Sequence, residues 1–402
     1  MRILVICQYY YPERFLINDI APELVKHGHI VTVLTGLPNY PRGIIPEEYH
    51  HGNKRKEVID GVSVIRCFEI ARKQGKFNLI LNYASFALSA RKALRTLDSE
   101  FDIVFCYQLS PVTMVSPALA YKKKYDKPVF LYCLDIWPES ALAHIRNKKG
   151  LLYKAITLYS KFVYQSCDCI AVTSKPFIEY FNDFLGIRNV KLVYIPQHAD
   201  GRFLEVDLYT EDNGIVDFLF AGNLGRGQKL ETIIKAVQQL RDRSDFLVHF
   251  VGDGSMRSSL EQMVKDSDID DKVIFHGQKN YEEMTKWYNK ADALLITLRG
   301  NSFVGNTMPG KLQTYMTIGK PIFGAINGAA KQVIEDAQCG ACVQAEDSIG
   351  LASIMADYID HPEEYSQCGL NSRKYFLQHF SFPVFMDRLE NELKGLVPNG
   401  IS

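Results

Sequence analysis

Short apolar runs alternate along this chain with longer stretches in which apolar residues recur at helical spacing. The runs are typical of buried parallel strands and the longer stretches of amphipathic helices. In the first half, the pattern predicts strands at 3–7, 30–35, 62–67, 102–107, 129–134, 169–173 and 190–195, with helices at 14–27, 78–97, 112–125, 150–165 and 175–185. The second half repeats the scheme, with strands near 217–221, 246–251, 272–276, 293–297, 321–325 and 341–344.

This order predicts two Rossmann-like, doubly wound α/β domains in series. A chain of 402 residues also exceeds what one hydrophobic core usually supports. The boundary is expected within 195–201, where a strand stops at a proline, which gives domains at 1–200 and 201–380. The amphipathic tail, 381–402, is expected to form a helix that packs back on the first domain. Ligands of such sheets bind beyond the carboxyl ends of the strands, so the site is expected in a cleft between two facing domains.

The stretch 218–236, FLFAGNLGRGQKLETIIKA, predicts a strand, a tight turn and a helix. Gly222, Gly225 and Gly227 allow the backbone to approach a ligand closely, and the helix start offers unpaired N–H groups and the positive end of a dipole. Arg226 and Lys229 add positive charge, so a diphosphate is the natural ligand. A tight connection that binds no ligand is the alternative.

The composition is that of a soluble globular protein, with 47% hydrophobic and 23% charged residues. The zero net charge hides a polarity, because residues 1–200 carry 26 Lys and Arg against 18 Asp and Glu and the rest of the chain carries 20 against 28. The first half therefore suits an anionic surface or partner. Nine scattered cysteines favour a reducing cytosol over a disulfide framework. The start of the chain is interpreted as a strand and not as a signal peptide, and no run is long enough to span a bilayer.

Several motifs together carry a family resemblance. In the second half they are AGNLGRGQKL (221–230), HFVGDG (249–254), VIFHGQKNYEEMTKWYNKADALLI (273–296) and NTMPGKLQTYMTIGKPIFGAING (306–328). In the first half they are QYYYPE (8–13), TGLPNYPRG (35–43) and LDIWPES (134–140). Their order and spacing resemble the GT-B glycosyltransferases of family 4, in the polysaccharide branch that includes amino-deoxysugar transferases of O-antigen and capsule assembly.

The resemblance implies a retaining transfer of a sugar from a nucleotide-diphosphate donor, expected to be a UDP-sugar, to a lipid-linked saccharide. Undecaprenyl diphosphate is the expected lipid carrier, the cytoplasmic face of the cell membrane is the expected location, and neither a metal nor nucleic acid is expected to bind. The C-terminal domain would hold the donor. Its candidate donor-binding residues are Gly222, Asn223, Leu224, Gly225, Arg226, Gln228, Lys229, Gly252, Gly277, Asn306, Thr307, Pro309, Gly310, Gln313 and Thr314.

The chain departs from the family pattern around the diphosphate. Where many relatives have an Arg and a Lys, it has Asn223 and Gln228, so the charge of the leaving diphosphate is expected to meet Lys311, with Arg226 or Lys229 as helpers. Where relatives have two glutamates, it has Asn306 and Thr314. Asn306 is then expected to hydrogen-bond a sugar hydroxyl, and Thr314 or Gln313 a ribose hydroxyl.

In the first domain, many relatives have a His within the segment that here spans 131–139, and this chain has none. Asp135 and Glu139 are the candidate catalytic residues there, to orient the donor sugar or to accept the acceptor's proton. A helix N-cap is the alternative role for Asp135. In front-face transfer the diphosphate oxygen itself can accept the proton. The candidate acceptor-side residues are Tyr10, Tyr11, Glu13, Asn39, Tyr40 and Arg42.

Basic residues gather around the apolar segment 77–88 and a second apolar stretch within 151–164. They are Arg72, Lys73, Lys76, Arg91, Lys92, Arg95, Lys122, Lys123, Lys124, Arg146, Lys148, Lys149 and Lys154. This pattern predicts a surface that meets anionic lipid headgroups, with ordinary solvated helix faces as the alternative. The acidic run 266–271 is interpreted as a solvated turn and not as a metal site.

Two other functions fit the same architecture. A nucleotide-sugar epimerase would convert a free UDP-sugar without a lipid acceptor. A catalytically silent homologue would act as a binding subunit of a glycan-assembly complex, and the missing glutamates and His are the main argument for it. The glycines, Lys311 and Asp135 remain together, which favours the transferase.

Overall fold

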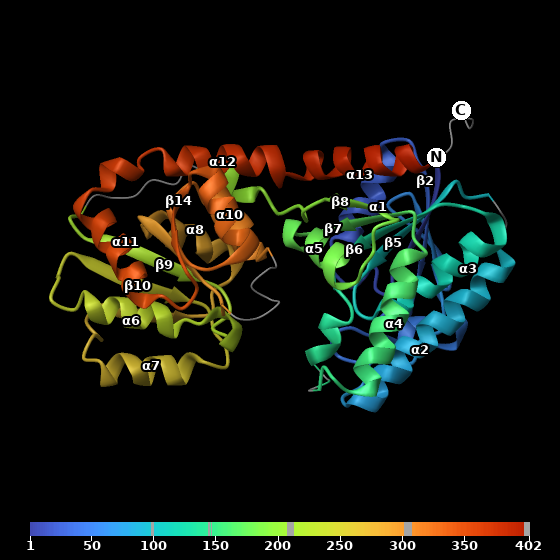
Figure 1. Cartoon of the computed structure of the whole chain (residues 1–402), viewed down its shortest axis with the longest axis horizontal. Coiled ribbons are helices and arrows are strands. Elements are labelled where there is room, and N and C mark those ends of the chain that lie inside the picture. Colours follow the sequence, from blue (N-terminus) through green and yellow to red (C-terminus); the bar gives the residue numbers. More distant parts are fainter. Residues whose placement is uncertain (98–99, 144, 146, 207–212, 301–307, 398–402) are drawn as a thin grey trace. The chain divides into compact units, whose positions relative to one another are not determined.

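A computed structural model of the chain describes residues 1–97, 100–143, 145, 147–206, 213–300 and 308–397. The chain divides into two compact units (Figure 1). Unit 1 comprises Met1–Ile195 and Met386–Ser402, and unit 2 comprises Pro196–Phe385. The division falls at the Ile195–Pro196 bond, within the segment where a boundary was expected.

Unit 1 is built on an eight-stranded sheet of order β3-β4-β2-β1-β5-β6-β7-β8. Its strands are β1 (Arg2–Ile6), β2 (Ile30–Thr35), β3 (Lys56–Ile59), β4 (Val62–Arg66), β5 (Ile103–Gln108), β6 (Val129–Cys133), β7 (Cys169–Val172) and β8 (Lys191–Tyr194). All neighbours are parallel except β3 and β4. The edge strand β3 was not predicted, because its sequence KEVI has only two apolar residues, Val58 and Ile59, after two charged ones in a polar stretch.

Unit 2 holds a six-stranded, wholly parallel sheet of order β11-β10-β9-β12-β13-β14. Its strands are β9 (Val216–Ala221), β10 (Phe246–Val251), β11 (Val273–Gly277), β12 (Ala293–Thr297), β13 (Ile322–Ala325) and β14 (Gly340–Val343). Most strand residues are fully buried, which explains why they form apolar runs in the sequence. Two Rossmann-like, doubly wound units are therefore present, as predicted.

Helices cover the faces of both sheets. They are α1 (Ile17–Lys26), α2 (Lys76–Ala93), α3 (Ser116–Tyr125), α4 (Leu151–Gln165), α5 (Lys175–Glu179), α6 (Glu231–Gln239), α7 (Arg257–Asp266), α8 (Tyr281–Lys290), α9 (Gly310–Ile318), α10 (Gly328–Ala337), α11 (Ser348–Asp360), α12 (Cys368–His379) and α13 (Phe382–Leu396). The strand order in each unit reverses at one point, between β1 and β5 in unit 1 and between β9 and β12 in unit 2. Ligands of open α/β sheets bind at the carboxyl ends of the strands at such points.

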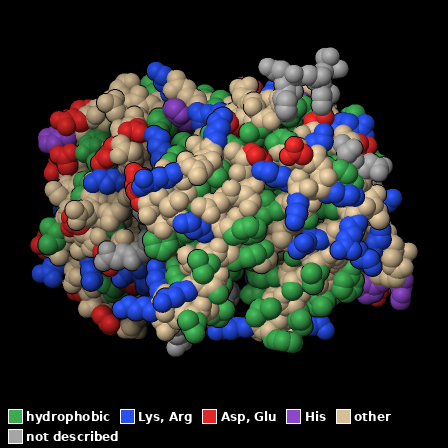
Figure 2. Space-filling model, turned by 45° about the vertical axis from the view of Figure 1, so that its right-hand side comes forward, with side chains coloured by type: hydrophobic (Ala, Val, Ile, Leu, Met, Phe, Trp, Pro, Cys, Tyr) green, Lys and Arg blue, Asp and Glu red, His purple; other side chains and the backbone are tan. Residues whose placement is uncertain are grey.

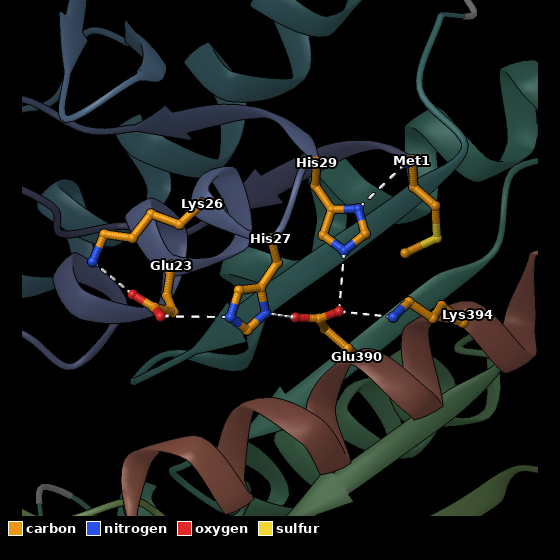
Figure 3. A network of polar contacts seen from close by, with 7 residues as sticks. All are labelled: Met1, Glu23, Lys26, His27, His29, Glu390 and Lys394. Atoms are coloured by element: carbon orange, nitrogen blue, oxygen red, sulfur yellow. Dashed lines mark hydrogen bonds and ion pairs between the residues drawn. The ribbon is translucent and has the colours of Figure 1, made fainter.

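Helix α13 contacts unit 1 through a network centred on the carboxylate of Glu390 (Figure 3). Glu390 accepts hydrogen bonds from His27, from His29 Nε2 at 3.3 Å and from Lys394 Nζ at 2.8 Å. Burial alone would raise the pKa of Glu390, but these hydrogen bonds outweigh burial and lower it to about 2. The carboxylate therefore stays charged across the physiological range and holds α13 on the segment 27–29.

A second polar cluster lies inside unit 2, on three neighbouring strands. His249 Nε2 contacts Asp217 Oδ1 at 2.6 Å, and Lys290 Nζ donates to Asp217 Oδ2 at 2.7 Å. His249 Nδ1 lies 2.9 Å from His276 Nε2, and the His276 ring packs 3.8 Å from the ring of Trp287. Burial, and then the nearby His249, lower the pKa of His276 to about 4.

His276 should therefore make unit 2 sensitive to acid. An unfolded His takes up its proton near pH 6.5 but His276 does so only near pH 4, so stability is present above pH 6.5 and lost as the pH falls between these values. Because the ring is partly exposed, we expect a loss of about 1–2 kcal/mol and not the full value of the shift. Thermal denaturation of the parent and of His276→Gln between pH 7.5 and 4.5 measures this loss. If the stability of both proteins falls equally with pH, the prediction is contradicted.

Candidate functional site

The loops that follow β9, β10 and β11 pack backbone against backbone through glycines. Gly222 N–H donates to the Val251 carbonyl at 2.8 Å, and Gly252 N–H donates to the Gly277 carbonyl at 2.9 Å. A Cβ on Gly252 would lie 1.9 Å from the Gly222 carbonyl oxygen, and its φ of 143° disfavours any side chain. Gly252 is therefore required for loop packing, whatever ligand the loops bind.

Lys311 lies against Gly222 in the loop after β9. It stands in the first turn of α9, as predicted, and its Cε is 2.9 Å from where a Cβ of Gly222 would be. Its Nζ donates to Gln228 Oε1 at 3.1 Å and lies 3.3 Å from the centroid of the Phe220 ring. Burial lowers the pKa of Lys311 well below its usual range, and no carboxylate pairs with it among the described residues. An anion placed on this ammonium would supply the missing counter-charge.

Tyr315 fixes the position of Lys311, and sequence analysis did not single it out. The Ala221 N–H donates to Tyr315 Oη at 2.8 Å, at the last residue of β9. Lys311 precedes Tyr315 by four residues and thus lies on the same face of α9. The hydroxyl therefore holds α9 against the end of β9, next to the contact between Lys311 and Gly222. The signal for this role was a tyrosine one helical turn after the lysine.

A short turn separates Gly222 from the helix that follows it, as the stretch 218–236 predicts. α6 starts at Glu231, and the intervening residues form the short turn Arg226–Gln228 followed by Lys229 in a left-handed conformation, with φ 51°. The predicted strand, turn and helix are therefore all present. The cation that lies at Gly222 comes from the first turn of α9.

Two of the other predicted donor-binding residues have different roles. Leu224 is fully buried in the core, and only its backbone takes part in the loop. Lys229 Nζ pairs with Glu346 Oε2 at 3.0 Å, so its charge is already balanced and its expected help to Lys311 is not supported. Asn223, Gly225 and Arg226 remain at the surface of the turn, and Arg226 has no ion pair within the described part of the chain.

The expected ribose contacts are also altered. Gln313 is buried, and its amide donates to the Gln197 carbonyl at 2.6 Å, so this N–H is used within the protein. Thr314 Oγ1 bonds the Gly310 carbonyl one turn earlier, at 3.3 Å. Pro309 caps α9 and Gly310 begins it. Asn306 and Thr307 lie outside the described residues.

In unit 1, Asp135 follows β6 and binds the loop after the neighbouring strand β5. Its Oδ2 accepts from Ser110 N at 2.8 Å and from Ser110 Oγ at 2.7 Å. The Trp137 indole N–H donates to the same Ser110 hydroxyl at 3.1 Å. Asp135 is therefore not the N-cap that was its alternative role, and it remains half exposed at the carboxyl edge of the sheet.

Glu139 does not have the surroundings of a reacting carboxylate. It is buried, and it accepts from Tyr153 Oη at 2.9 Å, Tyr180 Oη at 3.2 Å and Lys148 Nζ at 3.1 Å. These three donors tie the segment after β6 to α4, to the loop before it and to the turn that follows α5. The prediction of a catalytic role for Glu139 is therefore corrected to a structural one.

The acceptor-side candidates form one loop cluster. Glu13 Oε1 accepts from the backbone N–H of Asn39, at 2.6 Å, and of Tyr40. Burial raises the pKa of Glu13 to about 7, although both hydrogen bonds favour the ionised form. Tyr11, Tyr40 and Arg42 are exposed, whereas Tyr10 is buried and offers no surface to a substrate.

A buried polar network that the sequence did not reveal supports this cluster. Asn82 Nδ2, from α2, donates to Glu69 Oε1 at 2.6 Å and to Asn39 Oδ1 at 3.3 Å, and Gln8 Nε2 donates to Glu69 Oε1 at 2.7 Å. Glu69 is fully buried, and burial raises its pKa to about 8. The nearby charge of Glu13 contributes to this rise of the pKa. Two carboxyls with elevated pKa values at one sheet edge are typical of a functional site.

Family models match both units. Residues 16–200 match the model of Glycosyltransferase Family 4, and residues 209–375 match that of glycosyl transferases group 1. The chain is similar to the putative colanic acid biosynthesis glycosyl transferase WcaI of Escherichia coli K12, with 23% identity over 79% of this chain and 82% of that protein. It is also similar to O-antigen chain mannosyltransferase C of Escherichia coli, with 22% identity over 97% of each chain.

Solved structures show the same fold at low identity. The Anabaena protein HepE, in complex with UDP, matches with a TM-score of 0.69 and 14% identity over 98% of this chain and all of that one. The lipopolysaccharide outer core galactosyltransferase WaaB, in its apo form, matches with a TM-score of 0.69 and 15% identity over 98% of this chain and 99% of that one.

Proposed function

Because the chain belongs to the family 4-like glycosyltransferases of the GT-B fold, we propose that it transfers a sugar, with retention, from a nucleotide-diphosphate donor to a lipid-linked saccharide. The observation that carries this proposal is Lys311, a partly buried ammonium without a carboxylate partner among the described residues, held against the Gly222 backbone. Such a site suits a leaving diphosphate, because negative charge grows on it as the sugar departs.

The relatives' names support the kind of donor and pathway. HepE was solved with UDP, and a UDP-sugar is the donor we propose here. WcaI and mannosyltransferase C are named for colanic acid and O-antigen, which supports a role in surface polysaccharide assembly. The acceptor that we propose is an undecaprenyl-diphosphate-linked saccharide. In unit 1, Asp135 remains our candidate for orienting the donor sugar or accepting the proton.

We propose that no metal takes part. Among the described residues no group of three or more His, Cys, Asp or Glu side chains is arranged to hold a metal ion, and Lys311 offers a positive charge in its place. The acidic run 266–271 lies between α7 and β11, where Asp271 pairs with Lys272.

A transfer assay tests this function. Purified protein is incubated with UDP-sugars and an undecaprenyl-diphosphate-linked saccharide, with EDTA, and product linkage is determined by NMR. Transfer with retention that survives EDTA supports the proposal. Loss of activity on chelation, restored by manganese or magnesium, would refute metal independence. Conversion of free UDP-sugar without acceptor would indicate the epimerase, and UDP-sugar binding with neither reaction the silent subunit.

We further propose that unit 1 binds anionic membranes through its helices α2 and α4. Both pack on the turn Val112–Val115, and the charge of Arg91 on α2 acts on Tyr159 of α4, so the helices are neighbours. Figure 2 shows hydrophobic side chains gathered on this face with Lys and Arg around them. The exposed apolar residues of the two helices are Phe77, Ile80, Leu88, Leu151, Leu152, Leu158 and Phe162.

Part of the predicted basic surface is neutralised within the protein. Lys122 pairs with Asp168 and Lys148 with Glu139, while Lys73, Arg91 and Lys92 have no ion pair within the described residues. No described helix is both long and apolar enough to cross a bilayer. We propose a reversible contact at the inner face of the cell membrane. Apolar side chains enter the interface, and basic residues attract anionic headgroups with a strength that salt reduces.

Replacing Phe77, Ile80, Leu151 and Leu158 by Ser should release the protein from vesicles of phosphatidylglycerol. We expect at least a tenfold loss of partitioning, since each exposed apolar side chain buried in the interface contributes about 1 kcal/mol or more. Vesicle sedimentation measures this. The matched control is Ile349→Ser with Leu370→Ser, two equally exposed apolar residues of unit 2. Equal binding of both variants, or binding insensitive to salt, would contradict the proposal.

A further inference from the structure

The loops after β1, β2 and β4 build an aromatic cluster around one guanidinium. The rings of Tyr9 and Phe15 stack with centroids 5.4 Å apart, and the ring of Tyr40 lies 5.5 Å from the first and 5.6 Å from the second. The Arg72 guanidinium carbon lies 5.6 Å from the centroid of Tyr40 and 5.9 Å from that of Tyr83, which comes from α2. These strands are neighbours in the sheet, so the cluster lies at its carboxyl edge.

The backbone on both sides of this guanidinium is fixed. Arg72 N–H donates to Asn39 Oδ1 at 2.8 Å, and Gly43 N–H donates to the Asn39 carbonyl at 2.6 Å. A Cβ on Gly43 would lie 2.3 Å from the Arg72 carbonyl oxygen, so the two loops are in contact without room for a side chain. Arg72 is thus presented on a preorganised base, which lowers the entropic cost of binding a ligand.

Among the residues that the structure describes, no carboxylate forms an ion pair with Arg72. The groups that act on Arg72 are the phenols of Tyr83, Tyr9 and Tyr40, and its Nη1 donates to Tyr9 Oη at 3.5 Å. Lys73 follows Arg72 in the sequence, and Arg42 precedes Gly43, which contacts the Arg72 backbone. Neither has an ion pair in the described ranges. The buried Glu69 adds little negative charge near neutral pH, because burial raises its pKa to about 8.

We propose that Arg72 binds a phosphoryl group carried by a substrate of the transfer reaction, with the exposed face of Tyr40 beside it as a stacking surface. The planar guanidinium can bind a phosphate through two parallel hydrogen bonds. The tyrosine rings around it are neutral, so they position its positive charge without neutralising it. The inference rests on the proposed function. The phosphoryl group has two possible sources, the diphosphate of a lipid-linked acceptor and the diphosphate of the nucleotide donor.

Calorimetric titration of the full-length chain with farnesyl diphosphate and with UDP tests the inference. Arg72→Gln should weaken one of the two probes by tenfold or more, and Arg188→Gln, an exposed residue just before the amino end of β8, should weaken neither. If the affinity for farnesyl diphosphate falls and that for UDP is unchanged, the phosphoryl group belongs to the acceptor. If the affinity for UDP falls and that for farnesyl diphosphate is unchanged, it belongs to the donor. Farnesol, which lacks the diphosphate, should not distinguish the parent from Arg72→Gln.

The outcomes separate this inference from the function beneath it. Unchanged affinity of Arg72→Gln for both probes would overturn the inference even if the parent transfers sugar. A tenfold loss would uphold it even if the parent transfers none. Should Arg72→Gln not fold, Arg72→Lys keeps the charge without the planar fork, and an affinity equal to that of the parent for both probes would then overturn bidentate binding.

Discussion

Replacing Lys311 by Ala should lower turnover by about 10²- to 10³-fold while leaving the affinity for the nucleotide sugar nearly unchanged. The reason is that Lys311 has no counter-charge among the described residues and lies at the Gly222 backbone, where the leaving diphosphate is proposed to sit. Its contact with the diphosphate strengthens as the bond breaks. Steady-state kinetics with separate donor binding by calorimetry measure the split.

Two companion variants sharpen this prediction. Lys311→Arg should recover only part of the activity, because a planar fork does not replace a point charge. Lys229→Ala should reduce turnover by no more than about threefold, since Lys229 already pairs with Glu346. Equal effects of the two alanine variants would show that Lys311 is not the main cation for the leaving group.

Lys311 also predicts proton uptake on binding of UDP, which carries the negative charge that the leaving diphosphate gains. Burial keeps its pKa well below the usual range in the free protein, and a bound diphosphate favours the charged form. At a pH between the free and bound pKa values, UDP binding should therefore take up protons. The binding enthalpy measured in buffers of different ionisation enthalpy reports this, and Lys311→Ala should abolish the buffer dependence.

Replacing Gly252 by Ala should destabilise unit 2 by about 3–5 kcal/mol and remove nucleotide binding. The added Cβ would lie 1.9 Å from the Gly222 carbonyl oxygen, which is backbone and has no rotamer by which to yield. The loops after β9 and β10 would have to separate, and the Gly222 backbone would leave Lys311. The melting temperature should fall by about 10 °C.

The neighbouring loop after β9 offers a control for the packing effect. Gly227 has open space around the position of a Cβ, so Gly227→Ala should retain the melting temperature of the parent. If the two variants melt alike, close packing is not what Gly252 provides. If Gly252→Ala melts normally but fails to bind UDP, its role is contact with the ligand and not loop packing.

Much of the fold could be predicted from the sequence because most strands are buried on both faces and form continuous apolar runs. β3 could not, since it is a short edge strand whose four residues include the charged Lys56 and Glu57, one on each face. The place of Lys311 was predictable because a Pro-Gly pair marks the start of a helix, and the structure puts that start beside the Gly222 loop.

The rest of the candidate site depends on pairings that no local pattern encodes. Lys229 and Glu346 are far apart in the chain, and so are Glu69 and Gln8. A lysine free to bind phosphate and one paired with a glutamate have the same sequence signature. Arg72 lies near Lys73 and Lys76 in the sequence, so the sequence predicts a membrane-facing cation. In the structure it lies beside the rings of Tyr40 and Tyr83.

The last helix, α13, gives the order of synthesis a consequence for folding. Its residues from Met386 onward complete unit 1, where Glu390 holds His27 and His29 and Glu392 pairs with Lys191 at 2.6 Å. A ribosome makes these residues only after all of unit 2. The nascent first unit therefore lacks Leu389 and Leu393 in its core until the residues after unit 2 have been synthesised. Unit 2 has no such gap, so it is free to finish folding before the unit that precedes it in the chain.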